Sequence, residues 1–125
     1  MFQGKAELEY HNSWLIAKCD PELLEYYRWW IWKVHHVWLM RPRWGAHISV
    51  VRGSEEKTPV DCLYELRRKD LVISFQYSNR LERHVDGYVW MPVWGYDLED
   101  VREECGVSRQ PIMPFHMTVG KSDLL

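Results

Sequence analysis

His47-Ile48-Ser49-Val50 and His116-Met117-Thr118-Val119 decide how this chain of 125 residues is interpreted. Each stretch places a hydroxyl residue two positions after a histidine and then a hydrophobic residue. Ile, Val and Thr favour β-structure, and residues i and i+2 of a strand project from the same face. The sequence therefore predicts two strands, each presenting an imidazole and a hydroxyl side by side.

One such match is weak evidence by itself. With six His and nine Ser or Thr in 125 residues, roughly 0.4 His-x-Ser/Thr matches are expected by chance. Three matches occur, of which His11-Asn12-Ser13 is followed by Trp14. The other two are both followed by Val and both lie in strand-like settings, which is less easily accidental. The alternative interpretation is a pair of structural histidines whose hydrogen bonds are satisfied within their strands.

The segments around these two stretches predict both helices and strands. Asp20-Pro21-Glu22 is typical of a helix start, because Asp caps, Pro suits the first turn and an acid favours the positive end of the helix dipole. The expected elements are a strand over 8–18, a helix over 20–38, a strand over 45–52, strands over 71–77 and 84–94, a helix over 97–105 capped by Asp97, and a strand over 115–119. Residues 60–69 are ambiguous and could hold a helical turn.

The apolar spacing in the first helix predicts a buried stripe. Its members are Leu23, Tyr27, Trp30, Ile31, Val34 and Trp38. The order of elements is strand, helix, strand, then two strands, helix, strand, so the two halves of the chain echo each other. We expect one domain over residues 1–125, with a two-lobed α+β fold of mostly antiparallel sheets, flanking helices and a central cleft.

Charge and cysteine content limit the class of partner. The net charge is −2, with 16 basic and 18 acidic residues, which argues against a long nucleic acid as the main ligand. A small anion needs only a local cluster of positive charge, for which Arg41 and Arg52 are candidates; both could equally be solvated surface residues. We expect a monomer or weak homo-oligomer.

Three cysteines, Cys19, Cys62 and Cys105, form an odd set without close spacing, which predicts neither a disulfide framework nor a Cys-x-x-Cys metal site. This usage fits a reducing cytoplasm. We expect no signal peptide and no membrane-spanning segment, because the sequence contains no apolar run of the required length.

The residue types in the two stretches suit cleavage of a phosphodiester beside a ribose 2′-hydroxyl. That reaction needs a base for the attacking hydroxyl, an acid for the departing oxygen and donors for the phosphoryl oxygens. His47 and His116 could supply the base and the acid near neutral pH, and Ser49 and Thr118 could supply the donors. We expect no metal and no cofactor, because the sequence shows no tight ligand cluster and His35-His36 point about 100° apart on a helix.

Aromatic side chains could hold the bases of a nucleotide by stacking. The chain has eight Trp and seven Tyr, too many large rings to bury completely. Tyr10, Trp44 and Tyr77 are the candidate stacking residues, with ordinary packing as the alternative for each.

The two stretches resemble the paired motifs of the two-histidine phosphoesterase superfamily, the group that includes LigT-type RNA ligases and cyclic phosphodiesterases. The segment Leu39–Gly53, the residues around Cys19-Asp20 and the spacing of the two histidines are similar to phage anti-CBASS phosphodiesterases, which degrade cyclic di- and trinucleotide immune messengers such as 3′,3′-cyclic GMP-AMP. This resemblance implies metal-independent cleavage of 3′–5′ linkages by the neighbouring 2′-hydroxyl. The sequence ends soon after His116, so we expect closure over the ligand to depend on other elements or a second subunit.

Two alternatives remain at this point. The protein could instead cleave 2′,3′-cyclic phosphates or 2′–5′ linkages in RNA. It could also be a non-catalytic module that only sequesters cyclic nucleotides, although such a module would have no need for a matched acid and base.

Overall fold

The computed structural model describes residues 1–11, 14–53 and 72–122. Its elements follow the chain in this order: β1 (Phe2–His11), β2 (Trp14–Lys18), α1 (Pro21–His35), β3 (His47–Val51), β4 (Val72–Tyr77), β5 (Glu82–Arg83), β6 (Tyr88–Trp94), α3 (Tyr96–Glu104) and β7 (His116–Lys121). The ambiguous stretch at residues 60–69, which contains Cys62, lies outside the described residues.

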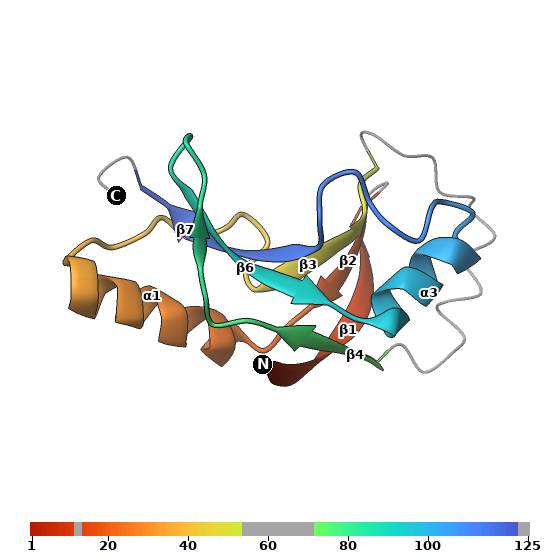
Figure 1. Cartoon of the computed structure of the whole chain (residues 1–125), viewed down its shortest axis with the longest axis horizontal. Coiled ribbons are helices and arrows are strands. Elements are labelled where there is room, and N and C mark those ends of the chain that lie inside the picture. Colours follow the sequence, from red (N-terminus) through yellow and green to blue (C-terminus); the bar gives the residue numbers. More distant parts are fainter. Residues whose placement is uncertain (12–13, 54–71, 123–125) are drawn as a thin grey trace.

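Six of these strands form a closed antiparallel barrel. Their order is β4-β1-β2-β3-β7-β6, and pairing of β4 with β6 closes the ring, while β5 pairs with the outer part of β6. Helices α1 and α3 lie toward opposite ends of the molecule (Figure 1). The expected two-lobed α+β fold with a central cleft is therefore wrong: one continuous sheet curls on itself instead of dividing into two lobes.

The main cause of this error is the N-terminal segment. Residues 8–18 were expected to form one strand, whereas β1 and β2 are two strands paired from Glu7↔Lys18 to His11↔Trp14. The other edge of β1 pairs with β4, from Phe2↔Tyr77 to Glu7↔Val72. The extra strand supplies the link that lets the sheet close.

The barrel interior is a packed apolar core. Ala17, Ile48, Met117 and Met91 lie in register across β2, β3, β7 and β6, and each has 0% exposure. Side chains of a strand alternate between faces, so the neighbours of these four residues must point outward. Small barrels are filled by their own side chains, and this one leaves its outer surface and its rims for ligand binding.

Helix α1 starts as the sequence predicts. The Asp20 side chain accepts a hydrogen bond from the Glu22 backbone N–H at 2.9 Å, and Pro21 occupies the first turn. The helix ends at His35, earlier than expected, because His36 takes a left-handed conformation with φ 57° and donates its N–H to the Trp32 carbonyl at 2.7 Å. Trp38 therefore lies outside the helix.

The buried face of α1 differs from the predicted stripe. Its buried residues are Leu24, Tyr27, Arg28 and Ile31, while Trp30, Val34 and Trp38 are exposed. Arg28 explains why the buried face of α1 is rotated away from the predicted stripe. Its buried guanidinium donates to the Leu39 carbonyl at 2.6 Å, and Leu39 packs against the barrel. Hydrophobic spacing alone does not foresee an arginine that faces the core.

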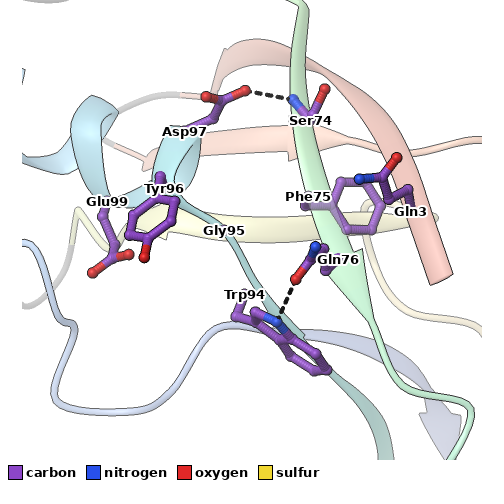
Figure 2. A pocket seen from close by; sticks show the side chains of 9 residues that line it. All are labelled: Gln3, Ser74, Phe75, Gln76, Trp94, Gly95, Tyr96, Asp97 and Glu99. Carbon is purple, nitrogen blue, oxygen red and sulfur yellow. Dashed lines mark hydrogen bonds between the residues drawn. The ribbon is translucent and has the colours of Figure 1, made fainter. Parts of the chain in front are cut away.

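Helix α3 covers the seam where β4 and β6 part. These two strands pair only at Gln76↔Trp94 and Tyr77↔Val93. Beyond that point the Ser74 backbone N–H donates a hydrogen bond to the Asp97 carboxylate at 2.8 Å instead of to a carbonyl of β6 (Figure 2). Asp97 was expected to cap α3, but Gly95 holds that position and Asp97 closes the end of the seam.

Cys19 and Cys105 are buried free thiols, and burial raises the pKa of the Cys19 thiol to about 12, with the charge of Asp20 adding to the shift. Among the described residues, no helix has the length and apolar character needed to cross a bilayer.

Candidate functional site

The two His-x-hydroxyl stretches lie on neighbouring strands of the barrel. β3 and β7 are antiparallel and in register at Ile48↔Met117. One step to either side, this register sets His47 opposite Thr118 and His116 opposite Ser49. Because Ile48 and Met117 point inward, these four side chains share the outer face. All four are half-buried, so each is reachable from solvent and still held by its surroundings.

The four groups form a square in which each imidazole sits beside the hydroxyl of the other strand. Side chains directly opposite each other in an antiparallel pair are about 4.5–5.5 Å apart at Cβ, and diagonal neighbours about 7–8 Å. His47 and His116 occupy one diagonal of the square, and Ser49 and Thr118 the other. The register therefore gathers both imidazoles and both hydroxyls in one patch on the outer face of the barrel.

Both imidazoles are anchored in the same way. His47 Nδ1 lies 2.9 Å from the Gly45 carbonyl, and His116 Nδ1 lies 2.8 Å from the Pro114 carbonyl. A carbonyl oxygen only accepts, so each Nδ1 must carry the proton. In the neutral ring Nε2 then holds the lone pair, which fixes the tautomer that a base at Nε2 requires.

His116 is tuned toward its neutral form. Burial lowers the pKa of His116, and the positive charges of Arg52 and His47 lower it further against the opposing effect of the Pro114 carbonyl. The guanidinium of Arg52 also donates to the Met113 sulfur at 3.4 Å and lies 5.7 Å from the centroid of the Trp14 ring. Arg52 therefore supplies positive charge next to the square.

An indole stands beside each histidine. The Trp44 ring is 5.6 Å from the His47 ring, and the Trp90 ring is 5.2 Å from the His116 ring, both tilted edge to face. Trp90 reaches this place through its register opposite Thr118. These rings restrict the motion of the imidazoles.

A hollow of about 240 Å³ adjoins this square. His116 and Thr118 form one wall, and Arg52 and the hairpin that joins β5 to β6 form the rest. A larger hollow of about 480 Å³ lies at the seam between β4 and β6 (Figure 2).

Three of the polar side chains that line the larger hollow are hydrogen-bonded within the protein. Gln76 accepts from the Trp94 indole at 2.8 Å, Asp97 bonds Ser74, and Glu99 accepts from the Gln110 side-chain amide. We therefore assign the seam hollow a structural origin and place the candidate site at the square.

Of the predicted ligand-contacting residues, only Trp44 and Arg52 lie near the square. Tyr10 pairs with Leu15 and alternates with Glu9, which puts it on the inward face at the barrel rim. Tyr77 stacks on Phe2 at 5.4 Å and packs against the core. Arg41 forms an ion pair with Glu25 of α1 at 2.7 Å. The structure does not bring these three residues to the histidines.

The sequence interpretation did not select several residues that the structure places here. They are Trp90, Tyr88, His84 and Asp86. No local motif marks them, because their position depends on the pairing of β6 with β7. The sequence offered one indirect signal, the turn at Gly87, which indicates that the segment His84–Tyr88 is a hairpin.

Within residues 1–11, 14–53 and 72–122, no group of three or more His, Cys, Asp or Glu side chains is arranged to hold a metal ion. Comparisons with protein-family models, curated proteins and solved structures found no match.

Proposed function

We propose that this protein is a phosphodiesterase of the two-histidine type that cleaves 3′–5′ linkages in cyclic di- and trinucleotide messengers, as an anti-CBASS function would require. One observation supports this proposal above all others. Two imidazoles with the same anchored tautomer alternate with two hydroxyls in one patch on the outer face of the barrel.

His116 is the base in this proposal. Its lowered pKa keeps the ring neutral near pH 7, so Nε2 can take the proton of the ribose 2′-hydroxyl as that oxygen attacks phosphorus. His47, in its protonated form, gives a proton to the departing 5′-oxygen as the phosphorus–oxygen bond breaks. The products are an opened strand with a 2′,3′-cyclic phosphate at one end and a 5′-hydroxyl at the other.

Ser49 and Thr118 donate hydrogen bonds to the non-bridging phosphoryl oxygens, where negative charge increases in the transition state. Arg52 adds positive charge at the same edge of the square. The reverse protonation states of the two imidazoles would then allow water to open the cyclic phosphate. A module that only sequesters the ligand would gain nothing from this matched pair.

The test is product analysis with purified protein in excess EDTA. We expect 3′,3′-cyclic GMP-AMP to be cleaved without added metal, and we expect the analogue lacking the 2′-hydroxyl beside the scissile bond to resist. A panel with 2′,3′-cyclic AMP and a 2′–5′ linked dinucleotide distinguishes the alternative substrates. His35→Ala is the matched control for variants of His47 and His116, since His35 is an exposed histidine at the end of α1.

Loss of all activity in EDTA would contradict the metal-independent mechanism. Turnover of only the 2′–5′ or 2′,3′-cyclic substrates would move the protein to the alternative class. Tight binding of cyclic dinucleotides without any product would support the sequestering module. The proposed substrates are messengers of the bacterial cytoplasm, so the proposal also assigns the protein to that compartment.

A further inference from the structure

The hollow beside His116 has two walls of different chemistry. Its inner wall contains His116, Thr118 and Arg52, the groups that face the scissile phosphate in the proposed function. Its outer wall comes from the β5–β6 hairpin. With about 240 Å³ it is smaller than the roughly 300–1,000 Å³ of sites that enclose a whole drug-sized ligand. It therefore suits one nucleoside of a larger molecule.

Asp86 holds the tip of the hairpin in a fixed geometry. Its Oδ1 accepts from the Tyr88 backbone N–H at 3.2 Å and lies 3.0 Å from His84 Nδ1. The turn is closed by the Gly87 N–H on the His84 carbonyl at 3.0 Å, and Gly87 takes the left-handed conformation that this turn requires. Both bonds use Oδ1, and the backbone N–H of Asp86 also stabilises the ionised carboxylate.

The carboxylate of Asp86 stays ionised over a wide range. Partial desolvation works against ionisation, but the Tyr88 N–H and the His84 imidazole together hold the pKa of Asp86 below its ordinary value. An ionised carboxylate is only an acceptor. The outer wall of the hollow is therefore specific for ligand groups that donate hydrogen bonds.

Flat rings and cations complete the hollow. Trp90 and Tyr88 lie between the hairpin and the square, and rings in such positions stack on nucleobases. Lys121 Nζ lies 5.2 Å from the Tyr88 ring centroid, and Arg52 lies at the inner wall. These two cations offset the negative charge of Asp86 for an anionic ligand.

We propose that this hollow is a nucleobase subsite in which Asp86 recognises the Watson–Crick edge of guanine; this inference rests on the proposed function. Guanine carries N1–H and an N2 amine side by side, and both donate in the direction of one carboxylate. Adenine presents an acceptor at N1 and an amine on the other side of it. Hypoxanthine keeps N1–H and lacks the N2 amine.

The experiment compares kcat/KM for cyclic di-GMP, cyclic di-IMP and cyclic di-AMP. A good two-point contact with a base edge discriminates by about 1–3 kcal/mol, so we expect cyclic di-GMP to exceed cyclic di-AMP by about tenfold or more, with cyclic di-IMP between them. Cyclic di-IMP tests the contact from the ligand side and leaves the protein unchanged.

Asp86→Asn should lower the guanine-to-adenine ratio to about one. Its amide oxygen can still accept from the Tyr88 N–H, so the hairpin is kept. Glu82→Gln is the matched control, because Glu82 is an exposed acid on the same hairpin, does not line the hollow and loses the same charge. It should leave the ratio unchanged.

Equal rates with all three ligands in the wild type, or an unchanged ratio in Asp86→Asn, would overturn the subsite. Failure of the proposed function is distinguishable, since it appears as no product from any cyclic dinucleotide. In that case calorimetric binding of the same three ligands to the wild type measures the same ratio directly. A guanine preference in binding that Asp86→Asn abolishes supports the subsite, and its absence overturns it.

Discussion

Replacing His116 by Asn and by Gln separates the two ends of its imidazole. The Asn amide nitrogen occupies about the position of Nδ1 and can keep the 2.8 Å bond to the Pro114 carbonyl. It leaves nothing at Nε2. The Gln amide nitrogen reaches about the position of Nε2, but it has no basic lone pair. Neither variant can remove a proton, while the first keeps the anchor and the second keeps most of the volume.

The expected loss follows from the assigned role. General acid–base catalysis by one positioned side chain contributes about 10²–10⁴-fold, which corresponds to about 3–5.5 kcal/mol at 1.36 kcal/mol per tenfold. Both variants should lose activity in this range. His47→Gln should lose a similar factor, because its proton is needed in the same step.

The double variant of His47 and His116 gives the sharper result. Since the two imidazoles act on one phosphorus, their effects should not multiply, and the double variant should be about as slow as the slower single variant. Single-turnover cleavage of 3′,3′-cyclic GMP-AMP, followed by chromatography of the products, measures each rate. A His116→Asn variant within tenfold of wild type would refute the assignment of the base. Losses that multiply in the double variant would refute the shared step.

Three further predictions concern the same face of the barrel. Because the pKa of His116 is lowered, the acid limb of kcat/KM against pH should lie below 6.5; Arg52→Met should move that limb to higher pH, which a pH–rate series measures. Thr118→Val should reduce kcat by about 10²–10³-fold if its hydroxyl holds the phosphoryl charge, while Thr118→Ser should recover most of it in steady-state assays. Gly120→Ala should destabilise the fold by about 1–3 kcal/mol in urea titration, since an added Cβ would lie 2.5 Å from Leu39 Cβ and 2.6 Å from the Met40 carbonyl.

The same lowered pKa affects stability with the same sign as a paired carboxylate, because in both cases the pKa is lower in the folded protein than in the unfolded chain. The unfolded chain binds a proton at His116 near pH 6.5, whereas the folded protein binds it only at lower pH. Between these two values the unfolded state holds more protons, so the contribution of this group to stability is lost as the pH falls below about 6.5. Denaturant midpoints at pH 7.5 and 5.5, compared between wild type and His116→Asn, isolate this term.

Local chemistry made parts of the fold predictable. The start of α1 is determined within three residues by Asp20, Pro21 and Glu22, and the structure has the same cap. The alternation in the two His-x-hydroxyl strands is likewise a local property of extended chain. Each of these features needs only its neighbours in sequence, and each was identified correctly.

Features that depend on distant pairing were not predictable in the same way. The barrel closes through β4–β6 contacts between residues 76–77 and 93–94, and no local pattern favours this pairing over an open sheet. Tyr10 shows the consequence for the site. Tyr10 was expected to stack on a base, but the pairing of β1 with β2 places it on the inward face beside Leu15.

The antiparallel pairing of β3 and β7 also explains how the two histidines can differ in role. An antiparallel pair of identical motifs is related locally by a twofold axis, here through Ile48 and Met117. By backbone geometry alone, His47 and His116 are therefore interchangeable, and each has the same carbonyl anchor two residues before it. The surroundings of the strands differ, because burial and the positive charge of Arg52 lower the pKa of His116. In the proposed mechanism an acid and a base can thus arise from one repeated motif, because the pKa of His116 is lowered by burial and by Arg52, which lie outside the motif itself.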